Sequence, residues 1–284
     1  MSRILNFGSL NIDHVYQVEA FVRPGETISA LGYARHPGGK GLNQSIALAR
    51  AGAHVLHAGC IGADGLFLKE LLEADGVDCD AVVVLDGVPT GHAVIQVSAQ
   101  GENCIVICGG ANQAIPSSLI ETATAKLSPG DIILLQNEIS RIPEIMCAAS
   151  AAGARIFFNP APFTTAVASY PLELLNTLIV NETEAEGLAH SGFDTLSCNV
   201  LLTRGSRGAR YVPKGGGTPV EVPAVPVSKV VDTTAAGDTF IGYFLAGLAR
   251  GEAVATAMAE AAKAASWCVA HAGAAPSIPK RAML

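Results

Sequence analysis

The chain has 284 residues, half of them apolar and 15% charged, and its formal net charge is −7. This length and apolar content exclude a disordered chain and predict a single α/β domain over residues 1–284. An acidic chain without a Lys/Arg cluster is a poor candidate for binding nucleic acid or an anionic membrane. Since no signal peptide or uninterrupted apolar span is present, we expect a cytoplasmic protein with reduced cysteines.

Short apolar runs alternate with Ala-rich segments of helical periodicity, which predicts a mostly parallel sheet flanked by helices. The runs at residues 4–10, 131–136, 155–158, 178–180 and 200–202 each end in polar residues. In open sheets of this class the ligand crevice lies outside the carboxyl ends of the strands. The polar strand ends therefore predict a catalytic or binding edge.

Two stretches, at residues 14–36 and 90–108, alternate apolar and polar residues with period two. This pattern predicts antiparallel hairpins outside the main sheet, forming a small lid over the active edge. The partly apolar outer face of such a lid favours pairing with a second copy, so we expect a homodimer. Cys104 and Cys108 share one strand face, where we expect a buried thiol pair and not a metal site.

The segment Gly-Gly-Lys-Gly-Leu-Asn at residues 38–43 precedes a predicted helix at residues 44–51. Its glycines allow close backbone approach, while Lys40 and Asn43 supply a cation and an amide donor. The spacing is not that of a Walker A loop. On its own, the segment is equally compatible with an ordinary turn and helix start.

The segment Asp-Thr-Thr-Ala-Ala-Gly-Asp-Thr-Phe at residues 232–240 leads into an apolar helix predicted at residues 239–249. Small residues at a helix N-terminus leave N–H groups free and predict an anion-binding nest. Asp238 beside this nest is either a helix cap or a general base for a hydroxyl that attacks a phosphoryl group. The Gly-Gly segment and the polar strand ends favour the base.

Carboxylates follow the run at residues 178–180, in the segment Asn-Glu-Thr-Glu-Ala-Glu. Carboxylates in a first helical turn are often only partners of the helix dipole. At this edge, Asn181 and Glu184 could also hold water around a Mg²⁺ ion.

These segments, in this order and with Asn11, Asp13 and Glu138, resemble the ribokinase family of ATP-dependent sugar kinases over residues 7–279. The resemblance is stronger to its ribose-phosphorylating members than to its fructose or nucleoside kinases. It implies transfer of the γ-phosphate of ATP to a primary hydroxyl of a small sugar, D-ribose before others, giving ribose 5-phosphate.

The resemblance also implies roles for individual residues. Those for sugar binding are Asn11, Asp13, Gly39, Lys40, Asn43, Glu138 and Asp238. Asp238 is also the implied catalytic base, with Ala236 and Gly237 in the anion hole. The implied ATP contacts are Asn181, Thr203, Gly205, Ser206, Gly208 and Gly237. Glu184 is implied to hold Mg²⁺ through water, and a K⁺ activator is implied at Asp232, Thr234, Cys268, His271, Gly273 and Ser277.

Two departures from the family pattern and several alternatives accompany this interpretation. The segment at residues 190–199 is short, which predicts a trimmed flanking helix, and Ala262 stands where the family often has an adenine contact. Another sugar, a sugar acid or a nucleoside stays open as substrate, since Tyr16, Phe21 and Tyr33 could stack on a base. A catalytically silent sugar-binding protein is a more distant alternative. The absence of Gly-x-Gly-x-x-Gly after the first strand argues against a dinucleotide-dependent dehydrogenase.

Overall fold

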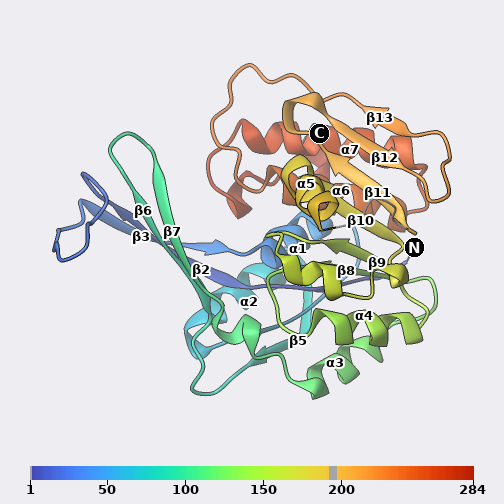
Figure 1. Ribbon diagram of the computed structural model, residues 1–284, viewed down its shortest axis with the longest axis horizontal. Coiled ribbons are helices and arrows are strands. Elements are labelled where there is room, and N and C mark those ends of the chain that lie inside the picture. The colour runs from blue at the N-terminus through green and yellow to red at the C-terminus, as the bar shows by residue number, and fades with distance from the viewer. Residues whose placement is uncertain (1, 192–196) are drawn as a thin grey trace.

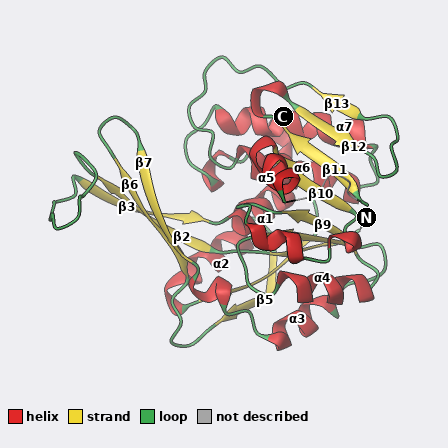
Figure 2. Ribbon diagram, in the orientation of Figure 1, coloured by secondary structure: helices red, strands yellow, loops and turns green. Residues whose placement is uncertain are grey.

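Two sheets and the helices around them make up the computed structural model, which describes residues 2–191 and 197–284 (Figures 1 and 2). The strands of the larger sheet are β1 (Ile4–Phe7), β4 (Val55–Ile61), β5 (Asp78–Val84), β8 (Ile132–Gln136), β9 (Arg155–Asn159), β10 (Thr177–Asn181), β11 (Asn199–Thr203), β12 (Ala209–Val212) and β13 (Val220–Val222). The helices are α1 (Lys40–Arg50), α2 (Leu66–Ala74), α3 (Ser117–Thr124), α4 (Ile142–Ala151), α5 (Glu182–His190), α6 (Ala236–Ala249) and α7 (Val254–Val269).

The larger sheet has the strand order β13-β12-β11-β10-β9-β8-β1-β4-β5. All neighbours from β5 to β11 are parallel, and β12 runs antiparallel to both β11 and β13. The predicted mostly parallel sheet flanked by helices is therefore confirmed. The carboxyl ends of β1, β8, β9, β10 and β11 meet along one edge, which brings their terminal polar residues together.

Aliphatic side chains pack on both faces of this sheet, as the near-continuous apolar runs require. In β8, Ile132 and Leu134 face one core and Ile133 and Leu135 face the other. Buried residues of α1, α2, α6 and α7 line the first core, and those of α3, α4 and α5 line the second. Among the described residues, no helix is long and apolar enough to cross a membrane.

The smaller sheet contains β2 (Asn11–Gln17), β3 (Gly32–Gly38), β6 (Gly91–Val97) and β7 (Asn103–Cys108). Its strand order is β3-β2-β6-β7, and Figure 1 shows it projecting away from the larger sheet. The two predicted hairpins are present, and parallel pairing of β2 with β6 joins them. Cys104 and Cys108 are exposed, so the expectation of a buried thiol pair is wrong, because β7 is an edge strand of a projecting sheet.

Two helices begin earlier than the sequence pattern suggests. Helix α1 starts at Lys40, not at residue 44, with Gly39 at its N-cap and a φ of 96°. Helix α6 starts at Ala236, three residues before Thr239. Lys40 and Asn43 thus project from the first turn of a helix. Helix α5 ends at His190, and residues 192–196 of the segment expected to be short lie outside the described residues.

Candidate active site

Glu138, just beyond β8, anchors the first turn of α1. One carboxylate oxygen, Oε2, accepts hydrogen bonds from the Ser9 hydroxyl and from the backbone N–H of Lys40 at 3.0 Å. The other, Oε1, lies 4.0 Å from the Lys40 ammonium nitrogen. Ser9 Oγ in turn accepts from the N–H of Gly41. Glu138 therefore holds Lys40 at the sheet edge, and together with Ser9 it satisfies the N–H groups of Lys40 and Gly41, which a helix start leaves unpaired.

Asn11 and Asp13 lie on the same face of β2, near its junction with the larger sheet, because they are two residues apart. The Nδ2 of buried Asn112 donates to Asn11 Oδ1 at 2.7 Å, which leaves the amide NH₂ of Asn11 to donate elsewhere. Burial, and then the nearby charge of Glu138, raise the pKa of Asp13 to about 6, against an opposing effect of His36. These two strand residues thus offer one donor and one carboxylate.

Gly38 permits this arrangement. A Cβ on Gly38 would lie 2.3 Å from Asp13 Oδ2, closer than any real contact. Any other residue at position 38 would displace the carboxylate of Asp13.

Asp238, in the first turn of α6, is held by two residues of α1. Its Oδ1 accepts from Gln44 Nε2 at 2.8 Å, and its Oδ2 accepts from Asn43 Nδ2 at 3.2 Å. Burial raises the pKa of Asp238, although Lys40 and these hydrogen bonds act in the opposite direction. Burial lowers the pKa of Lys40, but Asp238, Glu138 and Glu184 together raise it more. The arrangement is a cation and a carboxylate held side by side at the start of two helices.

The N-terminus of α6 has the form of an anion-binding nest. Ala235, its N-cap residue, adopts a left-handed conformation with a φ of 60°, directly before the right-handed helix. Such an alternation turns successive N–H groups toward one point, and a non-glycine residue in this region is strained. The N–H of Ala236 donates to Thr233 O at 3.3 Å. This leaves the N–H groups of Gly237 and Asp238 at the free end of the helix dipole.

A cleft of about 610 Å³ adjoins this helix start. The implied ATP-site residues Thr203, Gly205, Ser206, Gly208 and Gly237 line it, together with Ala236. Its remaining wall is mostly apolar and includes Val225, Val227, Val230, Phe240, Ala262 and Val269. Most of this wall was not predictable from the sequence, because the segment after β13 has no periodic pattern. An apolar slot beside an anion nest fits a flat base attached to phosphates.

Asn181 and Glu184 form a capping box at the start of α5. Asn181 Oδ1 accepts from the N–H of Glu184 at 2.8 Å, and Glu184 Oε2 accepts from the N–H of Asn181 at 2.9 Å. The capping box therefore engages the single side-chain oxygen of Asn181 and one of the two carboxylate oxygens of Glu184. Asn181 is not among the residues that line the 610 Å³ cleft.

The residues of the expected K⁺ site come together behind α6. Asp232 Oδ1 accepts from the N–H of Thr234 and Oδ2 accepts from the N–H of Gly273, both at 2.9 Å. Cys268 Sγ lies 2.9 Å from Ser277 Oγ and 3.5 Å from Thr234 O. The His271 ring, in contrast, stacks on Trp267 and is exposed, so only the backbone of residue 271 remains near the cluster. Among the described residues, no group of three or more His, Cys, Asp or Glu could hold a metal ion.

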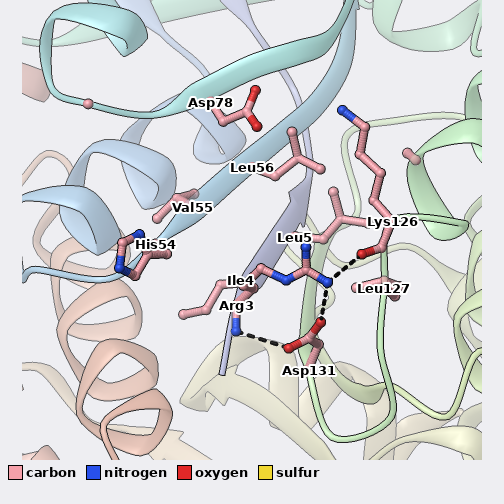
Figure 3. Close-up of a pocket in the computed structure, with 12 residues that line it drawn as sticks. Arg3, Ile4, Leu5, His54, Val55, Leu56, Asp78, Lys126, Leu127 and Asp131 are labelled. Carbon is pink, nitrogen blue, oxygen red and sulfur yellow. Dashed lines mark hydrogen bonds and ion pairs between the residues drawn. The ribbon is translucent and has the colours of Figure 1, made fainter. Parts of the chain in front are cut away.

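A smaller hollow of about 260 Å³ lies at the opposite ends of the strands, beside the starts of β1 and β4 (Figure 3). Arg3 bonds Asp131 with its backbone N–H and its guanidinium, at 3.0 and 3.2 Å, and donates to Lys126 O at 2.7 Å. These contacts tie β1 to the turn before β8. The charges in this hollow thus serve the fold and lie at the far end of the sheet from Asp238.

Comparisons with known proteins agree with this geometry. The chain matches the model of the pfkB family carbohydrate kinases over residues 1–281. It is 33% identical to a ribokinase of Haemophilus influenzae, over 96% of this chain and 94% of that protein. A ribokinase of Cryptococcus neoformans in complex with ADP superposes with a TM-score of 0.90 and 35% identity, covering 100% of this chain and 98% of that one. A ribokinase of Arabidopsis thaliana complexed with ribose and ATP gives a TM-score of 0.85 and 30% identity, with 99% and 96% covered.

Proposed function

The chain belongs to the pfkB family of carbohydrate kinases, and we propose that it transfers the γ-phosphate of ATP to the primary hydroxyl of D-ribose. The product would be ribose 5-phosphate. The observation that carries the proposal is the position of two consecutive residues at the start of α6. Gly237 lines the 610 Å³ cleft, and Asp238 contacts Asn43 and Gln44 of α1 on the sugar side.

In this proposal, Asp238 is the general base. As the sugar oxygen attacks the γ-phosphorus, its proton passes to a carboxylate oxygen of Asp238, and the bond from phosphorus to the ADP oxygen breaks. The N–H groups of Gly237 and Asp238 stabilise the negative charge that grows on the phosphoryl oxygens. Lys40, close to Asp238 and Glu138, adds positive charge at the same place.

The sugar would be positioned by Asn11, Asp13, Gly39, Lys40, Asn43 and Glu138. A pentose offers several hydroxyls, each able to donate and accept, and the amide of Asn11 and the carboxylate of Asp13 complement them. Holding the primary hydroxyl in line with the γ-phosphate converts a bimolecular step into an effectively unimolecular one.

Two ions are part of the proposal. Glu184 would hold Mg²⁺ through water, and the residues fit, since the capping box uses only one oxygen of this carboxylate in the bonds between described residues. When bound, the ion supplies positive charge for the ATP phosphates. A monovalent cation such as K⁺ would sit by Asp232, Thr234, Gly273 and Ser277. Backbone carbonyls of these two joined segments are ligands of the kind K⁺ takes.

A free sugar is favoured over a nucleoside by the direction of the Tyr16 and Tyr33 side chains. Tyr16 is three residues from Asp13 on β2, so the two point to opposite faces of the small sheet. Tyr33 lies opposite Tyr16 on β3, and their ring centroids are 5.0 Å apart. Neither ring shares the Asp13 face, where a base attached to the sugar would need a stacking partner.

The small sheet is proposed to act as a lid and as a dimer interface. On edge strand β7, Ile105, Val106 and Ile107 are 49%, 66% and 65% exposed. A long exposed apolar edge strand is a liability in a monomer, and a second copy of the same sheet would cover it. Closing the lid would exclude water, which limits hydrolysis of ATP.

The test is ADP release from Mg-ATP with a panel of sugars and nucleosides, each with and without K⁺. We expect fast turnover of D-ribose and stimulation by K⁺. Turnover of another compound, with D-ribose inert, would contradict the assigned sugar. Full activity without any monovalent cation would contradict the role of Asp232. A monomer in light scattering would contradict the dimer.

A further inference from the structure

We propose that Gln44 is a positioning residue for Asp238, and that a buried series of amides, Asn6 and Gln136, fixes the direction in which Gln44 points. This inference rests on the proposed role of Asp238 as the base. Asn6, Gln44 and Gln136 come from β1, α1 and β8, and all three are fully buried.

The direction of each amide follows from a backbone carbonyl at the start of the series. Asn6 Nδ2 donates to Gly41 O and to Ser45 Oγ, each at 2.8 Å. A carbonyl oxygen can only accept, so the Nδ2 of Asn6 must face it and Asn6 Oδ1 must face Gln136.

The next two amides inherit this direction. Gln136 Nε2 donates to Asn6 Oδ1 at 2.9 Å and to Gln44 Oε1 at 2.7 Å. Gln44 Oε1 is thereby turned away from α6, and Gln44 Nε2 donates to Asp238 Oδ1 at 2.8 Å. If the Gln44 amide were reversed, its Oε1 would face Asp238 Oδ1, and two acceptor oxygens would meet without a hydrogen between them.

This direction is kept although it leaves a buried acceptor unpaired. Gln136 Oε1 has no hydrogen-bond partner among the residues that the structure describes. An unpaired buried oxygen is destabilising, so a series serving only stability would gain from another arrangement. What the observed arrangement of the three amides provides is an N–H donor, Gln44 Nε2, that points at Asp238.

The consequence for the reaction is an asymmetric carboxylate. Oδ1 of Asp238 is engaged by the short bond from Gln44, while Oδ2 has the longer bond of 3.2 Å from Asn43. Oδ2 is therefore the oxygen that takes the sugar proton, and Gln44 sets its orientation and favours the ionised form. The other titratable groups near Asp238 are Lys40 of α1, Glu138 after β8 and Cys268 of α7.

The experiment compares kcat as a function of pH, with D-ribose and Mg-ATP saturating, in the wild type and in Gln44→Met and Gln44→Glu. Methionine has a similar length and no donor. Glutamate keeps an oxygen for Gln136 but removes the Nε2 donor, which also contacts Asn159 Oδ1 at 3.3 Å, and its own negative charge would raise the pKa of Asp238 further. We expect kcat near neutral pH to fall about tenfold and its acidic limb to move up by about one pH unit. KM for ATP should stay within about threefold.

Thr124→Val serves as the matched control, because Thr124 is buried in α3 and its hydroxyl donates to Ile120 O, its one hydrogen-bond partner in the described part of the chain. It removes a buried hydrogen bond far from the site, and its pH profile should equal that of the wild type. If both Gln44 variants fold and keep the wild-type acidic limb, the inference is wrong. If Asp238→Asn keeps most of its kcat, the base itself is wrongly assigned, which separates the two failures.

Discussion

Replacing Asp238 with asparagine tests the centre of the proposed reaction. The two side chains have nearly the same shape, but an amide cannot take up the proton of the sugar hydroxyl. Loss of a general base costs about 10²–10⁴ in kcat, so we expect a fall in this range. This corresponds to a barrier higher by about 3–5 kcal/mol.

The structure indicates that this variant keeps its fold. Gln44 Nε2 can donate to the new Oδ1 as it does to the carboxylate. The new Nδ2 would face the NH₂ of Asn43, but Asn43 Oδ1 has no hydrogen-bond partner among the described residues, so this amide can turn and accept. Asparagine also removes the charge whose burial raises the pKa of Asp238. We therefore expect the free energy of unfolding to change by no more than about 1 kcal/mol.

The assay is ADP release at saturating D-ribose and Mg-ATP, with urea unfolding measured on the same preparation. Asp86→Asn, which changes an exposed carboxylate between β5 and β6, is the control and should behave as the wild type. A folded Asp238→Asn protein with more than about a third of the wild-type kcat would refute the reasoning. The sugar proton would then be accepted without the carboxylate of Asp238.

Three further outcomes are expected. Gly237→Ala should fold with undiminished thermal stability, since a Cβ there meets nothing within 4 Å. Its kcat/KM for ATP should nevertheless fall about tenfold or more, because the methyl group enters the anion nest. A normal kcat/KM would contradict that nest. Because the pKa of Asp13 is raised to about 6, its carboxylate becomes protonated and loses its negative charge as the pH falls through this value. Calorimetry should then show weaker D-ribose binding below about pH 6, and equal affinity at about pH 5 and pH 7.5 would argue against its role. Ala235→Gly should raise the free energy of unfolding by about 1 kcal/mol in urea, because glycine accepts a φ of 60° without strain, and a fall would contradict the strain.

The framework of the fold was predictable because periodicity reports which faces of a segment are buried. Apolar runs predicted the parallel strands β1, β8, β9, β10 and β11 but not β4 and β5, and period-two alternation predicted the hairpins that contain β2, β3, β6 and β7. The exposure of Cys104 and Cys108 was not predictable in this way. Alternation indicates which residues of a strand share a face. Whether another part of the molecule covers that face depends on where the strand lies in the fold.

The candidate site was predictable at its motifs and not between them. Lys40, Asn43 and Asp238 stand in unusual glycine-rich or small-residue segments, which made them visible. Gln44 and Gln136 look like ordinary polar residues, and their connection exists only because β8 is the neighbour of β1 and α1 crosses both.

The amino-acid sequence by itself determined the polar residues that follow the strands, the glycine-rich segment before α1 and the small residues at the anion nest, because each depends on local backbone chemistry. Only the tertiary structure decided the left-handed Ala235, the apolar wall of the cleft and the direction of the amides behind Asp238. These features arise from groups distant in the chain, whose hydrogen bonds and contacts are fixed when the strand order of the sheet is fixed.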